Sequence, residues 1–347
     1  MDERTPLFGK TLAELQALAA AYGLPKFAAG QMADWLYGKE ISSIDEMTNL
    51  SKKAREALNE HHTFGLVEPV EVKTSADGTK KYLFPTAHGR FIETAMIPFK
   101  DRKTVCVSTQ VGCKMGCEFC MTGKQGFQGQ LTAGEIVNQI RSIPEWREVT
   151  NIVYMGMGEP FDNLDEVLQS VEILSAEWGY AMSPRRITVS SIGIVPGLVR
   201  FLNECEAHLA ISLHTPFPEE RRQLMPVQIA HPLDDIIEEI RKRDFGGQRR
   251  VSFEYIVFGG FNDTPRHAKE LSRLLAGIKC RINLIRFHPI PGTPLQATDE
   301  TTLQEFKDQL NNKGILTTIR ASRGLDIQAA CGLLSTQALA KRAEQGS

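Results

Sequence analysis

The chain has 347 residues, of which 42% are hydrophobic and 24% charged, and its formal net charge is -2. This composition is typical of a globular protein and argues against a disordered one, and the length allows one large domain with a smaller one. The near-neutral charge argues against a strong overall attraction to nucleic acid. Local basic groups are still candidate contacts, although a solvated helix face or loop is the commoner role for each: Arg185 and Arg186, Arg221 and Arg222, Arg241 to Arg243, and Arg249 and Arg250.

The beginning of the chain contains no targeting signal that we recognise. Residues 1–20 include Asp2, Glu3, Arg4 and Glu14 and hold no long apolar run, so neither a signal peptide nor a membrane span is predicted there. Seven cysteines, an odd number in a chain of this size, fit a reducing compartment better than a disulfide framework. We therefore expect a cytoplasmic protein without membrane association, in which clustered cysteines bind metal or take part in chemistry.

The first part of the chain is predicted to be helical. Apolar residues recur at helical spacing in 11–23, which ends at Gly23, and helical segments follow at 28–39 and 50–62 after short polar breaks. Between 68 and 98 the pattern changes to alternation with a period of two, and Asp77-Gly78 is a hairpin signal. We expect a helical module over 1–64, a candidate RNA contact, and a short antiparallel β connector over 65–100.

From Lys103 onward, apolar strands alternate with amphipathic helices. The predicted strands are TVCVSTQ, TNIVYMG, RITVSS, AHLAISLH, RVSFEYIVF and CRINLIRF, and predicted helices between them include 132–143, 163–179, 232–243 and 264–278. This alternation predicts an α/β fold, a partial (β/α)6 barrel over 101–322, followed by a segment over 323–347 that carries Cys331. Functional residues are then expected just after the strands.

Three cysteines follow the first of these strands, in QVGCKMGCEFCMTG. Cys113, Cys117 and Cys120 supply soft thiolate ligands suited to zinc or to an iron-sulfur cluster. Structural zinc normally takes four protein ligands, and the nearest histidines in the sequence are the distant His88 and His214. A 4Fe-4S cluster held by three cysteines leaves one iron open for a small molecule. We therefore favour the open cluster, with zinc as the alternative.

Other polar residues stand at the ends of the next strands. MGMGEP, residues 155–160, follows the second strand as a glycine-rich turn, Ser190 ends the third, and Ser212 and His214 end the fourth. Each alone is a weak signal, because a glycine turn or a lone buried histidine is commonly structural. Since parallel strands bring their carboxyl ends to one edge, we expect these residues to form a single site with the cysteines.

The C-x3-C-x2-C spacing resembles that of the radical S-adenosylmethionine (SAM) superfamily. The resemblance implies a barrel of the radical SAM type whose 4Fe-4S cluster, held by Cys113, Cys117 and Cys120, binds SAM at its open iron and cleaves it to a 5′-deoxyadenosyl radical. It also implies that SAM is contacted by residues of the glycine-rich turn and of the later strand ends: Gly158, Glu159, Ser190, Ser212, Leu213, His214 and Asn283.

Over nearly its whole length, the chain resembles the RlmN family of 23S rRNA and tRNA adenine methyltransferases. The matching segments include FAAGQMADWLY, IETAMIP, CVSTQVGCKMGCEFCMTGKQGF, LAISLHTP, INLIRFHPIPG and RASRGLDIQAACGLL. The resemblance implies methylation of carbon 2 of an adenosine in 23S rRNA and in tRNA. It further implies an electron donor such as flavodoxin or ferredoxin, and we expect a monomer.

The resemblance assigns chemistry to three more residues. Cys331 becomes methylated, its methyl group is converted to a radical that adds to the adenine, and Cys106 resolves the resulting protein-RNA adduct by forming a disulfide with Cys331. Glu93 corresponds to a glutamate that accepts a proton. By spacing alone, these two cysteines are as easily explained as buried small hydrophobes, like Cys205 and Cys280.

Three alternatives stay open. The Cfr type of enzyme, which methylates carbon 8, shares all five cysteines, although QGFQGQL and INLIRFHPIPGTP favour carbon 2. Another radical SAM enzyme, such as a glycyl-radical activase, would not need Cys106 and Cys331. A non-catalytic RNA-binding module with zinc or iron is the third.

Overall fold

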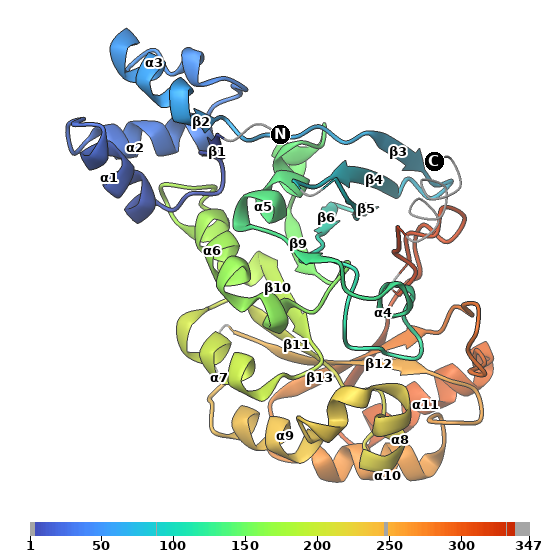
Figure 1. The fold of residues 1–347 in the computed structure, drawn as a ribbon. Helices are drawn as coiled ribbons and strands as arrows, with labels where there is room; N and C mark the ends of the chain where they lie inside the picture. Colours follow the sequence, from blue (N-terminus) through green and yellow to red (C-terminus); the bar gives the residue numbers. More distant parts are fainter. Residues whose placement is uncertain (1–3, 88, 246–248, 331, 337–347) are drawn as a thin grey trace.

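The computed structural model describes residues 4–87, 89–245, 249–330 and 332–336. The chain begins with a helical module (Figure 1), whose elements are β1 (Thr5–Pro6), α1 (Leu12–Ala21), α2 (Ala28–Ala33) with a π-helical turn (Asp34–Gly38), a 3-10 turn (Ile44–Glu46), α3 (Lys52–His61) and β2 (His62–Thr63). Strand β1 pairs in parallel with β2 and so joins the two ends of the module. Helix α1 begins with a capping box between Thr11 and Glu14. The three predicted helical segments are confirmed.

A single ten-stranded sheet follows, in the order β14-β13-β12-β11-β10-β9-β6-β5-β4-β3. Its strands are β3 (Glu71–Thr74), β4 (Lys80–Pro85), β5 (Phe91–Phe99), β6 (Arg102–Cys106), β9 (Asn151–Tyr154), β10 (Ile187–Ser191), β11 (His208–Ser212), β12 (Val251–Val257), β13 (Cys280–Arg286) and β14 (Leu316–Ile319). Neighbouring strands from β6 to β14 are parallel, whereas β3 to β6 pair antiparallel. The parallel part curves into an open barrel (Figure 1).

Helices cover the outer face of the barrel (Figure 1). They are α5 (Ala133–Arg141), α6 (Leu164–Ser175), α7 (Val195–Glu204), α8 (Pro218–Leu224), α9 (Leu233–Arg241), α10 (Pro265–Leu274) and α11 (Glu300–Asn312), while the short α4 (Met121–Gln125) and the pair β7 (Gln110–Val111) and β8 (Gly129–Gln130) belong to the loop after β6. Strand residues alternate between the two faces. Val189, Phe253 and Leu284 are fully buried in the core, whereas the adjacent Ser190, Ser252 and Asn283 line cavities inside the barrel.

The six predicted barrel strands are confirmed as β6, β9, β10, β11, β12 and β13, and β14 adds a seventh parallel strand that was not predicted. Strand β14 has only four residues and its first, Leu316, is 56% exposed, so it lacks the apolar run of a central strand. The predicted hairpin is present, with Gly78 at a φ of 85° between β3 and β4. The connector strands, however, extend the barrel sheet rather than forming a separate one. The domain boundaries stay predictions.

No helix in the described part of the chain is long and apolar enough to cross a membrane.

Candidate active site

The three clustered cysteines line one cavity at the carboxyl ends of the barrel strands, which we call the thiol cavity. Met121 N–H donates to the Gly332 carbonyl at 2.9 Å, and Glu118 N–H donates to the Leu224 carbonyl at 2.9 Å, so the loop is held at both the C-terminal segment and α8. Of the other predicted residues, Gly158, Glu159, Ser190, Ser212 and His214 line the same cavity. The structure therefore brings together residues from four successive strand ends.

The burial of Cys113 and Cys117 makes their thiolates unfavourable unless a positive charge, such as a metal centre, lies beside them. Burial raises the pKa of Cys113 to about 12, and it raises that of Cys117 as well, with neighbouring thiols adding to the shift. A bound metal supplies the positive charge that makes such thiolates favourable.

Among the described residues, no three His, Cys, Asp or Glu side chains converge on one point as the ligands of a single ion would. A cluster does not require this convergence, because each thiolate binds a different iron. Three soft donors beside a cavity therefore fit a 4Fe-4S cluster with an open iron.

The glycine-rich turn after β9 needs glycine for steric reasons. Gly158 has a φ of 100°, and a Cβ there would lie 2.6 Å from the Cβ of Gln110. At Gly156 a Cβ would lie 2.6 Å from the Val107 carbonyl oxygen. The turn is thus pressed against the segment after β6, and its backbone forms a wall of the thiol cavity.

The carboxylate of Glu159 fastens this turn to the end of β10. It accepts hydrogen bonds from the Ser191 hydroxyl at 2.6 Å, the Ile192 N–H at 3.0 Å and the Phe161 N–H at 3.0 Å. Burial raises the pKa of Glu159 to about 7. The backbone of Glu159 is engaged as well, since its N–H donates to Gln110 Oε1 at 2.8 Å and its carbonyl accepts the Asp162 N–H at 3.0 Å. Glu159 therefore shapes the wall of the cavity through both its side chain and its backbone.

His214 is held in an unusual conformation at the end of β11. Its φ is 59°, and its Nδ1 accepts the Ile256 N–H at 3.0 Å, so Nδ1 carries no proton. Burial, followed by the charge of Arg221, lowers the pKa of His214 to about 3. A neutral imidazole therefore lines the cavity. The Phe119 ring packs against it in an edge-to-face arrangement, with 4.7 Å between the two ring centroids.

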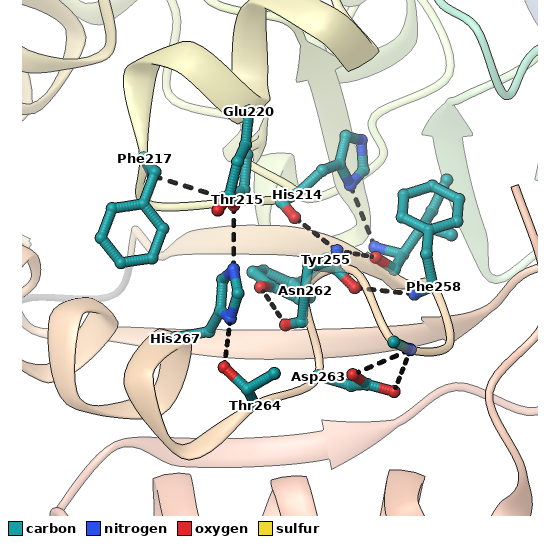
Figure 2. Close-up of polar contacts among 12 residues, drawn as sticks. His214, Thr215, Phe217, Glu220, Tyr255, Phe258, Asn262, Asp263, Thr264 and His267 are labelled. Atoms are coloured by element: carbon teal, nitrogen blue, oxygen red, sulfur yellow. Dashed lines mark hydrogen bonds and ion pairs between the residues drawn. The ribbon is translucent and has the colours of Figure 1, made fainter.

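Asn262, which we did not predict, locks His214 in place (Figure 2). Its amide donates to the carbonyls of His214 at 2.6 Å and Ile256 at 2.8 Å, and its Oδ1 accepts the Phe258 N–H at 2.7 Å. In the same view His267 bridges Glu220 at 2.8 Å and Thr264 at 2.7 Å. These contacts join the ends of β11 and β12. A polar residue in the turn after a strand was the only sequence signal for Asn262.

Arg221, on α8, is a second buried residue that holds strand ends. Its guanidinium donates to the Ile192 carbonyl at 2.7 Å, the Ser212 carbonyl at 3.3 Å and the Gln228 side chain at 2.7 Å. The residue is fully buried, and burial lowers its pKa to about 10. Arg222, its neighbour in the sequence, is exposed and pairs with Glu219. The arginine pair in the sequence therefore has one structural member and one surface member.

Two predicted cofactor residues lie apart from the thiol cavity. Leu213 is fully buried and does not line it. Asn283 lies within β13, where its amide donates to Glu254 at 2.7 Å and its Oδ1 accepts from Thr318 at 2.9 Å. Glu254 does line the thiol cavity, so Asn283 stands one residue behind its wall.

Cys106 ends β6 and lines a neighbouring cavity, the Cys106 cavity. The two cavities share four residues: Met155, Ile285, Arg320 and Leu334. Cys331 lies outside the described residues. Its two neighbours in the sequence are described: Ala330 lines the Cys106 cavity, and Gly332 lines the thiol cavity.

Glu93, on β5, lines neither cavity but contacts the same C-terminal segment. Its carboxylate accepts the Ser335 N–H at 2.9 Å and forms an ion pair with Lys81 at 2.8 Å. Both side chains of the ion pair are about nine-tenths buried, at 10% and 9% exposure.

Known proteins resemble this chain over almost its full length. Residues 107–271 match the Radical SAM superfamily, and residues 5–63 match the ribosomal RNA large subunit methyltransferase N-terminal domain. A protein of Phocaeicola vulgatus named probable dual-specificity RNA methyltransferase RlmN is 58% identical over 333 residues, which are 96% of this chain and 95% of that protein. The dual-specificity RNA methyltransferase RlmN of Syntrophus aciditrophicus is 42% identical over 96% of this chain and 97% of its own length.

A solved structure agrees with these relatives. The radical SAM methyltransferase from Sphaerobacter thermophilus has a TM-score of 0.88 and 42% identity, over 95% of this chain and 99% of its own. Membership of the superfamily implies a 4Fe-4S cluster and SAM as cofactors. With a matching N-terminal domain, a matching radical SAM region and relatives this similar over their full length, the chain belongs to the RlmN family of radical SAM RNA methyltransferases.

Proposed function

We propose that this methyltransferase transfers a methyl-derived carbon to carbon 2 of an adenosine in 23S rRNA and in tRNA. The observation that carries the proposal is the pair of adjoining cavities, one with the three cluster thiols and the other with Cys106. The residues before and after Cys331 line one cavity each. The described residues of this segment therefore line both the cavity of the proposed radical source and the cavity of the resolving thiol.

The target atom explains why this equipment is needed. Carbon 2 of adenine lies between two ring nitrogens and is electron-poor, so it cannot attack the methyl group of SAM by polar displacement. When bound at Cys113, Cys117 and Cys120, the reduced cluster with SAM supplies a 5′-deoxyadenosyl radical. The protein must then hold the carbon donor beside that radical and away from water.

The chain's own residues divide this work. Cys331 carries the methyl-derived carbon, which links its sulfur to carbon 2 of the adenine. The adduct formed by radical addition gives up one electron to an external acceptor and the carbon-2 proton. The thiolate of Cys106 then attacks the sulfur of Cys331, so the sulfur–carbon bond breaks, a disulfide forms, and the carbon leaves on the RNA with the bonding electron pair and takes up a proton to become the methyl group. A reductant must then reopen the disulfide. Glu93, the residue to which the family resemblance assigns the proton lost from carbon 2, lines neither cavity but contacts the C-terminal segment through the Ser335 N–H at 2.9 Å. Lys81, 2.8 Å away, offsets the charge of its carboxylate.

Nucleoside analysis tests the proposal. The protein, with cluster reconstituted anaerobically, is incubated with SAM, a reductant and unmodified 23S rRNA or tRNA, and the digested nucleosides are separated by mass spectrometry. We expect 2-methyladenosine from both RNAs. Only 8-methyladenosine would identify a Cfr-type activity, and no methylated adenosine from either RNA would overturn the proposal.

Two cysteine variants test the mechanism separately. Cys331→Ala is expected to yield no methylated adenosine, because the carbon has no carrier. Cys106→Ala is expected to accumulate protein crosslinked to RNA, because the adduct is formed but not resolved. Cys205→Ala serves as the control, since Cys205 is buried at the end of α7 away from both cavities. Full activity in both active-site variants would contradict the covalent mechanism.

A further inference from the structure

Four arginines stand at the amino ends of the barrel strands, opposite the thiol cavity. Arg102 begins β6, Arg185 precedes β10, Arg250 precedes β12, and Arg281 is the second residue of β13. Together with His208 they line one cavity, which we call the arginine cavity. The proposed chemistry uses none of these residues.

The four guanidinium groups are not tied to the described part of the chain by a hydrogen bond or an ion pair. Within residues 4–87, 89–245, 249–330 and 332–336, none of their side chains forms a hydrogen bond or an ion pair. Among the described residues that line the cavity, the acidic one is Glu254. Its carboxylate accepts a hydrogen bond from the Asn283 amide at 2.7 Å and forms an ion pair with Arg320 at 3.2 Å. Burial, and then the charges of Arg250 and Arg281, lower the pKa of His208. Positive charge is therefore concentrated here, and among the described lining residues it is offset in part by the charge of Glu254, which acts on Arg281.

Arginines nearby behave differently. Arg249, next to Arg250, donates to the carbonyls of Phe201, Leu202 and Ala207 and so fastens the end of α7. Arg102, Arg185 and Arg250 are exposed, so their donors are open to water or to a ligand rather than used within the protein. Several like charges at one cavity favour a ligand that brings negative charge and several acceptors.

The arginine cavity adjoins the active site inside the barrel. It shares Val153, Met155 and Arg320 with the Cys106 cavity, and it shares Met155, Glu254 and Arg320 with the thiol cavity. A nucleotide whose base reaches Cys106 would therefore have its backbone within reach of these arginines. Guanidinium groups match phosphate oxygens through paired hydrogen bonds.

We propose that the arginine cavity binds a backbone phosphate of the substrate RNA, next to the adenosine that enters the barrel. The proposal rests on the proposed RNA methylation and adds the contact that holds the strand. An enzyme that acts on an extruded base must offset the cost of unstacking it, and fixing the adjacent phosphates does so without reading sequence.

RNA binding by an arginine variant tests the proposal. The probe is a fluorescein-labelled RNA hairpin that the wild-type protein methylates, and Kd is measured from anisotropy between 50 and 300 mM KCl. Arg185→Gln with Arg250→Gln should weaken binding about 10- to 100-fold and reduce the slope of log K against log salt by about 1. The control, Arg186→Gln with Arg222→Gln, removes the same charge from exposed positions outside the cavity and should change Kd less than threefold.

A modified RNA locates the phosphate. A neutral methylphosphonate is placed at each linkage near the target adenosine in turn. We expect one linkage whose neutralisation weakens binding to the wild type about tenfold but leaves binding to the double variant unchanged. Equal losses in both proteins at every linkage would overturn the proposal. So would a variant that binds RNA normally while wild-type binding of inorganic phosphate depends on the arginines, since the site would then serve a free anion.

The outcomes separate this proposal from the one on which it rests. If the wild type methylates no adenosine, the proposed function fails whatever the arginines do. If it methylates normally and the double variant keeps the wild-type Kd and salt slope, only the phosphate site fails. Unchanged thermal unfolding and iron content in the variant show that it has folded, and Arg185→Lys with Arg250→Lys should retain most of the salt slope.

Discussion

The two ends of the barrel interior differ in how their charged and polar side chains are satisfied. At the carboxyl ends, Glu159, Arg221 and His214 are buried, and each makes hydrogen bonds to the backbone of neighbouring strand ends. At the amino ends, Arg185 and Arg250 are exposed and make no such bonds within the described structure. The first arrangement is rigid before any ligand binds, as a cofactor site requires, while the second is completed by a charged partner.

The largest expected difference between the ends concerns their cysteines. Cys117→Ala should reduce iron to background after reconstitution and abolish methylation, because the cluster loses one of its three ligands. Cys280→Ala, at the amino end of β13, should keep the iron content and most of the activity. Iron analysis and the SAM cleavage assay check both. Normal iron in Cys117→Ala would remove the basis for placing the cluster in the thiol cavity.

Arginines at the two ends should differ in their effect on stability. Arg221→Met leaves the carbonyls of Ile192 and Ser212 unpaired in a buried site, so we expect the free energy of unfolding to fall by about 2–4 kcal/mol. Arg222→Met and Arg185→Gln, both at exposed positions, should each change it by less than about 0.5 kcal/mol. Urea denaturation measures all three. A loss in Arg185→Gln as large as that in Arg221→Met would show that the amino-end arginine is structural too.

The buried imidazole at the carboxyl end should make stability depend on pH. Native His214 stays neutral down to about pH 3, whereas an unfolded histidine takes up a proton below about pH 6.5. Lowering the pH from 7.5 to 5.5 should therefore remove about 1 kcal/mol of stability through this residue. His214→Asn keeps an acceptor for the Ile256 N–H and should lose that part of the pH dependence. Parallel stability curves for the two proteins would contradict a depressed pKa.

The smallest effect concerns His208 in the arginine cavity. Since the charge of Arg250 contributes to lowering the pKa of His208, Arg250→Gln should raise that pKa. Arg186→Gln should leave it unchanged. Titration of the His208 ring resonance by NMR checks both, and addition of a substrate RNA to the wild type should raise the same pKa, because a phosphate would offset the arginine charges.

Local patterns were sufficient to predict most of the barrel. Alternating apolar strands and amphipathic helices predicted six parallel strands, and cysteine spacing predicted the place of the cluster loop. Strand β14 was missed because an edge strand of four residues, with Leu316 exposed, has no periodic signal. Asn262 was missed, and Arg221 was expected at the surface although it is fully buried, because a buried polar residue and a surface one look alike until their partners are known.

The sequence by itself determined the chemistry available to the protein, because thiol spacing, glycine turns and strand periodicity are local properties of the chain. Only the tertiary structure decided which arginine of each sequence pair is bonded to the backbone of other segments and which one faces a cavity or the solvent. Arg249 fastens α7 and Arg221 fastens two strand ends, while Arg185 and Arg250 face a shared cavity. Those roles depend on contacts between segments far apart in the chain, and such contacts form only when the sheet curves into the open barrel.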